Sequence, residues 1–186
     1  IRDLLRKKTS QGEYKLIMKS FNFDELKNSL NMKGKTLEIT EQDIDNFLTY
    51  KKGRQAFVVL SMLYSNLQYN EIEFDQDHIH PAVMFRDRKL AELKLNEEQI
   101  ERWKIIKDQI PNLQMMEERR NKVKNRTPFN EWLERITDPA GKEAYLKTNY
   151  IPKNISYEHI NFEEFFNKRK EILKKELINI LSEEKG

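Results

Sequence analysis

The stretch Glu71-Ile72-Glu73-Phe74-Asp75-Gln76-Asp77-His78-Ile79-His80-Pro81 decides which fold and which chemistry we expect. Polar and apolar side chains alternate over its first five residues, which is typical of a short, half-buried strand. Its final proline has no N–H to donate, so the strand is expected to end there. Four possible metal ligands or bases fall within six residues, and such a density indicates a functional site. They are Asp75, Asp77, His78 and His80.

The strand period limits how these side chains can act together. In a regular strand Asp75 and Asp77 share one face, whereas His78 and His80 share the other. A metal site that uses both Asp77 and His78 therefore needs an irregular backbone, and the nearby Pro81 is consistent with one.

A second strand and a short polar helix are expected further along the chain. The segment 112–116 reads Asn-Leu-Gln-Met-Met and predicts the strand, and 117–126 predicts the helix, which ends before Pro128. The helix segment has five cations and two carboxylates, a local charge of +3 that equals the formal charge of the whole chain. Asn121 and Lys124 would share one of its faces. The alternative for such a charge run is an ordinary solvated helix.

The segments on either side have helical spacing. Residues 54–64 form the most apolar stretch and predict a buried central helix. The other expected helices cover residues 13–31, 40–50 with Thr40 as N-cap, 86–110, and the segment that Asn161 opens and that runs to about 181. The fold class is therefore mainly α with a small ββα insert, an α+β architecture. We expect a helical lobe at 1–70, the insert at 71–133, and a C-terminal helical segment at 134–186 that packs on the same core.

Composition limits the function classes. The 34 Lys and Arg against 31 Asp and Glu leave a net charge of only +3, so any nucleic-acid-binding surface must be local. The absence of Cys excludes disulfides and thiolate-bound zinc, and it suits a reducing cytosol. No apolar run has the length of a membrane span. The chain opens at Ile1 with helical spacing at Leu4 and Leu5, so we expect it to be the C-terminal part of a longer protein.

Together these motifs resemble a known family. Asp77-His78-Ile79-His80-Pro81, Asn112-Leu113-Gln114 and Asn121-Lys122-Val123-Lys124 look like an HNH nuclease motif of the zinc-free ββα-metal type. With Pro128–Leu133 and the segment 162–181, they resemble the C-terminal HNH domain of GmrSD-like, modification-dependent restriction endonucleases. The resemblance covers roughly residues 50–181. It implies a bacterial, cytoplasmic, metal-dependent DNA endonuclease of an anti-phage restriction system.

The resemblance also implies roles for single residues. Asp77 and Asn121 would hold one divalent ion, Mg²⁺ or Mn²⁺, because oxygen ligands suit hard cations. His78 would be the general base that takes a proton from the attacking water. Asn112 would pin the loop and hold His78 in orientation. Lys124 would contact a DNA phosphate.

Three further expectations concern DNA and partners. Arg120 and Lys122 would join Lys124 in binding DNA phosphates. His80 departs from the minimal motif, and it would be structural, a substitute base or an extra phosphate contact. The family also implies an N-terminal nucleotide-hydrolysing sensor domain or partner chain, and this sequence has no G-x-x-x-x-G-K-[ST] loop of its own.

Two alternatives remain open from the sequence. The first is a catalytically inactive HNH fold that binds only nucleic acid or a partner protein. The second is a purely helical interaction domain in which these polar residues all lie on the surface.

Overall fold

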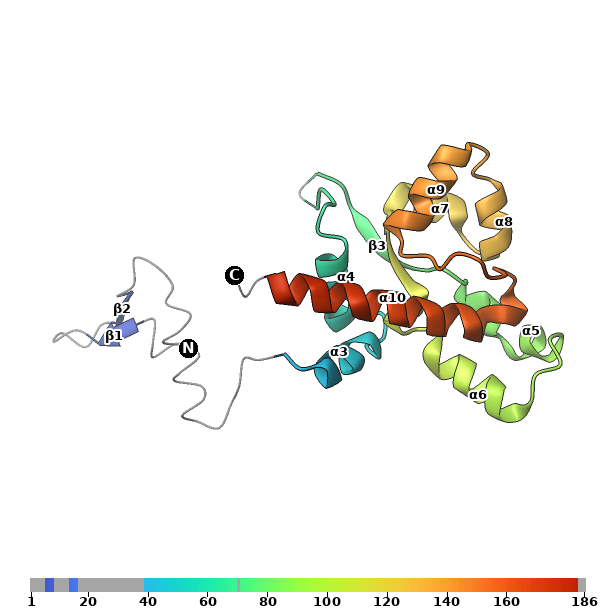
Figure 1. The fold of residues 1–186 in the computed structure, drawn as a ribbon, viewed down its shortest axis with the longest axis horizontal. Coiled ribbons are helices and arrows are strands. Elements are labelled where there is room, and N and C mark those ends of the chain that lie inside the picture. The colour runs from blue at the N-terminus through green and yellow to red at the C-terminus, as the bar shows by residue number, and fades with distance from the viewer. Residues whose placement is uncertain (1–5, 9–13, 17–38, 70, 184–186) are drawn as a thin grey trace. The chain divides into compact units, whose positions relative to one another are not determined.

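The computed structural model describes residues 6–8, 14–16, 39–69 and 71–183 of the chain (Figure 1). The chain divides into two compact units, Ile1–Ile39 and Thr40–Gly186. Each unit is described by itself.

The first unit contains a two-stranded antiparallel sheet. Strand β1 (Arg6–Lys8) pairs with β2 (Tyr14–Leu16), and Lys7 lies opposite Lys15. The prediction of a helix over 13–31 is therefore wrong at Tyr14–Leu16. Strands of three residues are too short to display a period, and their backbone groups bond across the pair instead of along one segment. The other residues of that predicted segment, 13 and 17–31, lie outside the described residues.

The second unit begins with two helices. Helix α3 (Glu41–Leu48) opens with a capping box, in which Thr40 Oγ1 accepts from the Asp43 N–H at 3.2 Å and an Asp43 carboxylate oxygen accepts from the Thr40 N–H at 2.8 Å. This confirms Thr40 as the N-cap. Helix α4 (Arg54–Leu63) follows. It is not buried all round as predicted, because Phe57 and Val58 are 40% and 59% exposed on its outer side.

The helix predicted at 86–110 is broken into two. Helix α5 covers Asp87–Ala91 and α6 covers Glu97–Ile106. Between them Lys94 adopts a left-handed conformation with φ of 55°. Asn96 then caps α6, since its side chain accepts from the Gln99 N–H at 2.8 Å and Gln99 bonds back to the Asn96 N–H at 3.1 Å. A capping box starts a helix, so one continuous helix was the wrong prediction.

Two strands and a short helix form the small sheet motif of this unit; the first strand follows α4, and the second strand and the helix follow α6. Strand β3 (Phe74–His78) pairs antiparallel with β4 (Leu113–Glu117), and Asp77 lies opposite Gln114. Helix α7 (Glu118–Lys124) follows β4 directly and contacts both strands. The predicted strand–strand–helix order is confirmed, with boundaries shifted by one to three residues. The unit is mainly helical with this small sheet, an α+β architecture.

The long helix α10 (Phe162–Glu183) connects the two hydrophobic clusters of the second unit (Figure 1). Phe162 and Phe165 belong to one cluster, and Leu173 and Leu177 belong to the other. Helices α8 (Phe129–Glu134) and α9 (Pro139–Thr148) complete the unit, together with three 3₁₀ turns. These turns are η1 (Ala82–Phe85), η2 (Ile110–Asn112) and η3 (His159–Asn161).

A buried arginine ties α10 to the sheet. Arg169 is fully buried, and its guanidinium donates to the carbonyl oxygens of Ile110, Pro111 and Asn149 at 3.1, 2.8 and 3.1 Å. Ile110 and Pro111 belong to η2, which leads directly into β4. The cation therefore holds the start of β4 against α10.

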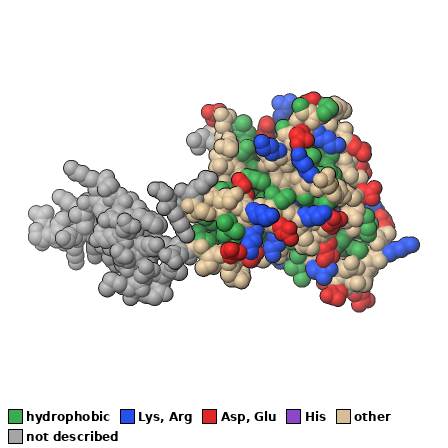
Figure 2. Space-filling view, viewed as in Figure 1, with side chains coloured by type: hydrophobic (Ala, Val, Ile, Leu, Met, Phe, Trp, Pro, Cys, Tyr) green, Lys and Arg blue, Asp and Glu red, His purple; other side chains and the backbone are tan. Residues whose placement is uncertain are grey.

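The surface of the second unit has no large block of one charge on the face shown in Figure 2, where Lys and Arg alternate with Asp and Glu. Among the described residues, no helix has both the length and the apolar character that crossing a membrane requires.

Candidate functional site

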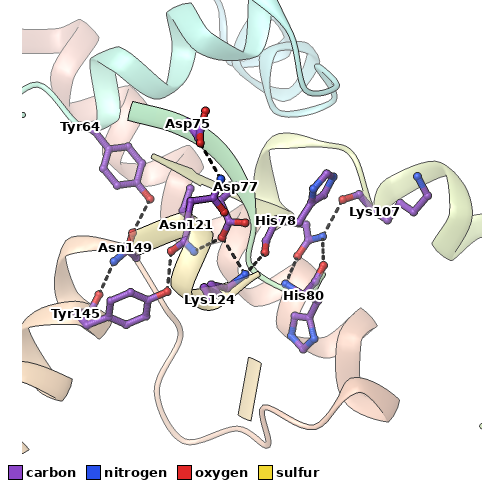
Figure 3. A network of polar contacts seen from close by, with 12 residues as sticks. Tyr64, Asp75, Asp77, His78, His80, Lys107, Asn121, Lys124, Tyr145 and Asn149 are labelled. Carbon is purple, nitrogen blue, oxygen red and sulfur yellow. Dashed lines mark hydrogen bonds and ion pairs between the residues drawn. The ribbon is translucent and has the colours of Figure 1, made fainter. Parts of the chain in front are cut away.

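The carboxylate of Asp77 is the centre of a buried polar network (Figure 3). Asp77 is only 8% exposed. Its Oδ2 accepts from Gln114 Nε2 on the paired strand at 2.8 Å and lies 2.8 Å from the ammonium of Lys124 on α7. Gln114 accepts in turn from the Tyr145 hydroxyl at 2.8 Å. Two strands and two helices therefore hold this carboxylate in one orientation.

Lys124 is fully buried, and this corrects the prediction that it contacts a DNA phosphate. Its ammonium donates to the His78 carbonyl oxygen at 2.6 Å in addition to its ion pair with Asp77. The physical reason is the position of α7 against the sheet, since the face of the helix that bears Lys124 meets β3. Burial lowers the pKa of Lys124, and the charge of Asp77 opposes that shift.

Asn121 makes its hydrogen bond to a neighbouring carboxylate. Its amide nitrogen donates to Asp75 Oδ2 at 2.8 Å (Figure 3). Asp75 and Asp77 lie two residues apart on β3, so α7 approaches this face of the strand with Lys124 at one carboxylate and Asn121 at the other. Asp77 and Asn121 therefore lie on the same face of β3, and the carboxylate that Asn121 contacts is that of Asp75.

His78 is oriented by a residue that sequence reasoning missed. Its Nε2 lies 2.8 Å from Asp108 Oδ1, and its side chain is 15% exposed. A carboxylate can only accept, so Nε2 carries the proton and Nδ1 keeps its lone pair. Burial lowers the pKa of His78, and Asp108 opposes that shift. No motif spacing connects Asp108 to His78, because they are 30 residues apart and meet only through tertiary packing.

Asn112 pins the chain on both sides of this pair. It is fully buried, its Oδ1 accepts from the His80 N–H at 2.9 Å, and its Nδ2 donates to the carbonyl oxygens of His80 and Lys107 at 3.1 and 2.7 Å. His80 follows the strand of His78, and Lys107 precedes Asp108. Asn112 therefore ties these two backbone segments together, and its hydrogen bonds in the described structure go to the backbone and not to the His78 ring.

His80 lies in the aromatic core. It is 1% exposed, and its ring centroid is 4.7 Å from that of Phe165 and 5.4 Å from those of Phe129 and Phe162. Burial lowers its pKa well below the ordinary value. Of the three roles left open for His80, the structural one agrees with this position, whereas a substitute base or a phosphate contact needs solvent access.

The two other predicted DNA contacts, Arg120 and Lys122, lie on opposite sides of α7, because they are two positions apart on the helix. Lys122 has a side chain that is 72% exposed and forms an ion pair with Glu118 at 2.6 Å. The exposed guanidinium of Arg120 lies 5.9 Å from the ring centroid of Tyr145, a cation–π arrangement.

Whether a metal ion suits the site depends on the oxygen and nitrogen atoms near Asp77 that could coordinate it. Within the described part of the chain, no three His, Asp or Glu side chains gather in a way that could hold a metal ion. The two predicted ligands, Asp77 and Asn121, offer a carboxylate and an amide oxygen, which suits a hard divalent cation in donor type. The positive charge that meets Asp77 in the structure is the ammonium of Lys124.

No family model matches the sequence, and no curated protein is significantly similar to it.

Proposed function

We propose that this chain is a metal-dependent endonuclease domain that hydrolyses DNA phosphodiester bonds, similar to the HNH domain of GmrSD-like restriction endonucleases. The observation that carries the proposal is the His78–Asp108 pair at the end of β3. Asp77 precedes His78 on this regularly paired strand, so its buried carboxylate lies on the opposite face of β3. An imidazole with one nitrogen held by a carboxylate and the other able to accept a proton is the arrangement that general-base catalysis requires.

His78 would accept the proton of the attacking water at Nδ1. Because burial lowers its pKa from 6.5, the imidazole is largely neutral at pH 7 and ready to act as a base. The Asp108 carboxylate would stabilise the imidazolium once the proton has moved. Asp108 is thus a positioning residue in this proposal, and Asn112 holds the two backbone segments at a constant separation.

Asp77 and Asn121 would hold one Mg²⁺ or Mn²⁺ ion. Such an ion polarises the scissile phosphate and stabilises the leaving oxygen. Lys124 would hold the Asp77 carboxylate fixed in orientation. As part of the same proposal, the domain is the bacterial, cytoplasmic effector of an anti-phage system, and an N-terminal nucleotide-hydrolysing domain or partner chain would select the substrate.

A specific observation favours a second candidate, a catalytically inactive domain of the same kind that only binds nucleic acid. The buried ammonium of Lys124 already neutralises Asp77, the only charged ligand proposed for the metal. If this ion pair persists in solution, Asp77 has less attraction for a divalent cation.

One experiment separates the two candidates. Supercoiled plasmid is incubated with the protein in Mg²⁺, in Mn²⁺ and in chelator, beside His78→Ala. The nuclease predicts cleavage that depends on the metal and falls about 10²–10⁴-fold in the variant, the range typical of a missing general base. Mn²⁺ calorimetry adds a readout that does not depend on cleavage, and Asp77→Asn should weaken binding while His78→Ala should not. Plasmid binding without cleavage or Mn²⁺ uptake would favour the inactive domain.

A further inference from the structure

Three cations precede or open helix α4 close to His78. Lys51, Lys52 and Arg54 are all exposed, and Gly53 separates the third from the first two. The first turn of α4 has no acidic residue. None of the three forms an ion pair with another residue of the described ranges. We call these three side chains the basic loop.

The basic loop is bound to the strand that bears His78. The Gly53 N–H donates to Gln76 Oε1 at 2.9 Å, and Gln76 Nε2 donates back to the Gly53 carbonyl oxygen at 3.1 Å. Gln76 lies two residues before His78, so the two side chains project from the same face of β3. Gly53 has φ of 151°, a conformation that residues with a side chain rarely adopt.

The basic loop is also bound to the segment that bears Asp108. The Lys52 N–H donates to the Asp108 carbonyl oxygen at 2.9 Å, and Lys51 forms an isolated β-bridge with Gln109. Asp108 in turn orients His78. These contacts hold the main chain of the basic loop next to the segments that bear His78 and Asp108, and none of them depends on the charged side chains.

We propose that Lys51, Lys52 and Arg54 bind backbone phosphates of duplex DNA on the His78 side of the site. This rests on the proposed function, since it supplies the substrate contacts that Lys124 was expected to make. Two of the three contacts predicted on helix α7 are less available, because Lys124 is buried and Lys122 is paired with Glu118. Phosphate contacts of this type position DNA without reading its sequence.

The test compares two variants with the same reduction of charge. The first is Lys51→Gln/Lys52→Gln/Arg54→Gln, and the second is Lys89→Gln/Lys153→Gln/Lys168→Gln, whose lysines lie in other parts of the second unit. Both are made in a His78→Ala background and measured without divalent metal, so that cleavage cannot affect the result. Fluorescence anisotropy of a short labelled duplex gives the dissociation constant between about 50 and 200 mM salt.

We expect the slope of log affinity against log salt to become shallower by about 2.7 in the basic-loop variant, about 0.9 for each phosphate that the variant no longer neutralises. The slope of the control variant should change by less than about 0.9. Equal changes in the two variants, or no measurable binding by the parent, would overturn the proposal. Plasmid cleavage tests the proposed function separately. If the basic loop binds DNA but the protein shows no nuclease activity, only the proposed endonuclease function is contradicted.

Discussion

Replacing Lys124 by methionine tests the buried ion pair on which the geometry of the site depends. The ammonium of Lys124 has no solvent exposure and lies 2.8 Å from Asp77 Oδ2, and Asp77 is itself 8% exposed. Lys124→Met keeps most of the side-chain volume and removes the charge. It leaves the Asp77 carboxylate buried with only Gln114 as a side-chain donor, and leaves the His78 carbonyl oxygen without this partner.

The expected loss in the free energy of unfolding follows from removing one partner of a buried ion pair. Removing one member of a buried ion pair typically destabilises a protein by about 3–5 kcal/mol, because the other charge stays buried without compensation. For a domain of this size, about 1 kcal/mol lowers the melting temperature by about 2–4 °C, so we expect a fall of about 6–20 °C. The double variant Asp77→Asn/Lys124→Met removes both charges and should recover most of this stability.

Circular dichroism at increasing temperature measures the effect, and Lys122→Met is the matched control. Lys122 lies on the same short helix, but its ion pair with Glu118 is solvent-exposed. An exposed pair contributes at most about 1 kcal/mol, so the control should melt close to the parent. If Lys124→Met and Lys122→Met melt at the same temperature, or if the double variant is no more stable than Lys124→Met, the buried pair is not the stabilising feature described above.

Three more predictions concern single residues. Asp108→Asn should reduce metal-dependent plasmid cleavage by about 10²–10⁴-fold with little change in melting temperature, because His78 loses its orienting carboxylate; full activity would refute the positioning role. Burial lowers the pKa of His159 from 6.5 to about 4, so the unfolded chain binds the proton more readily than the folded one. Stability should therefore fall by about 3 kcal/mol as the pH drops from about 6.5 to 4, and urea titrations of His159→Leu should show a flatter pH profile. Arg169→Met should lower the free energy of unfolding by at least about 3 kcal/mol, since the buried carbonyl oxygens of Pro111 and Asn149 lose the guanidinium as a donor and that of Ile110 keeps only the Leu113 N–H. Urea unfolding that matches the parent would contradict this.

Local sequence signals predict the sheet and several helix starts correctly. The alternation around Phe74 and the proline at 81 indicate a strand that ends near its observed limit at His78. Thr40 followed by acidic residues predicts the N-terminus of α3, because a cap is a contact between residues three positions apart. The same kind of local signal is present at Asn96, but the helical spacing on both sides of it hides the break, so one helix is predicted where two exist.

The candidate site was predictable only in part. The density of polar residues singled out Asp77 and His78, whereas the family resemblance implied Asn112 and Asn121. In the structure Asp77 lies on the face of β3 that α7 covers, and Asn112 follows the end of the strand at His78. Spacing did not identify Asp108, because its hydrogen bond to His78 joins residues 30 positions apart in two different elements.

The sequence by itself determined the order strand, strand, helix and the residue types available at their ends, because backbone period and capping depend on near neighbours. Only the tertiary structure decided which charges meet water. Lys122 and Lys124 are two positions apart on one helix, yet one is 72% exposed and the other is fully buried against Asp77. A helix turns by about 200° over two residues, so the packing that buries Lys124 against the sheet leaves Lys122 in solvent on the opposite side.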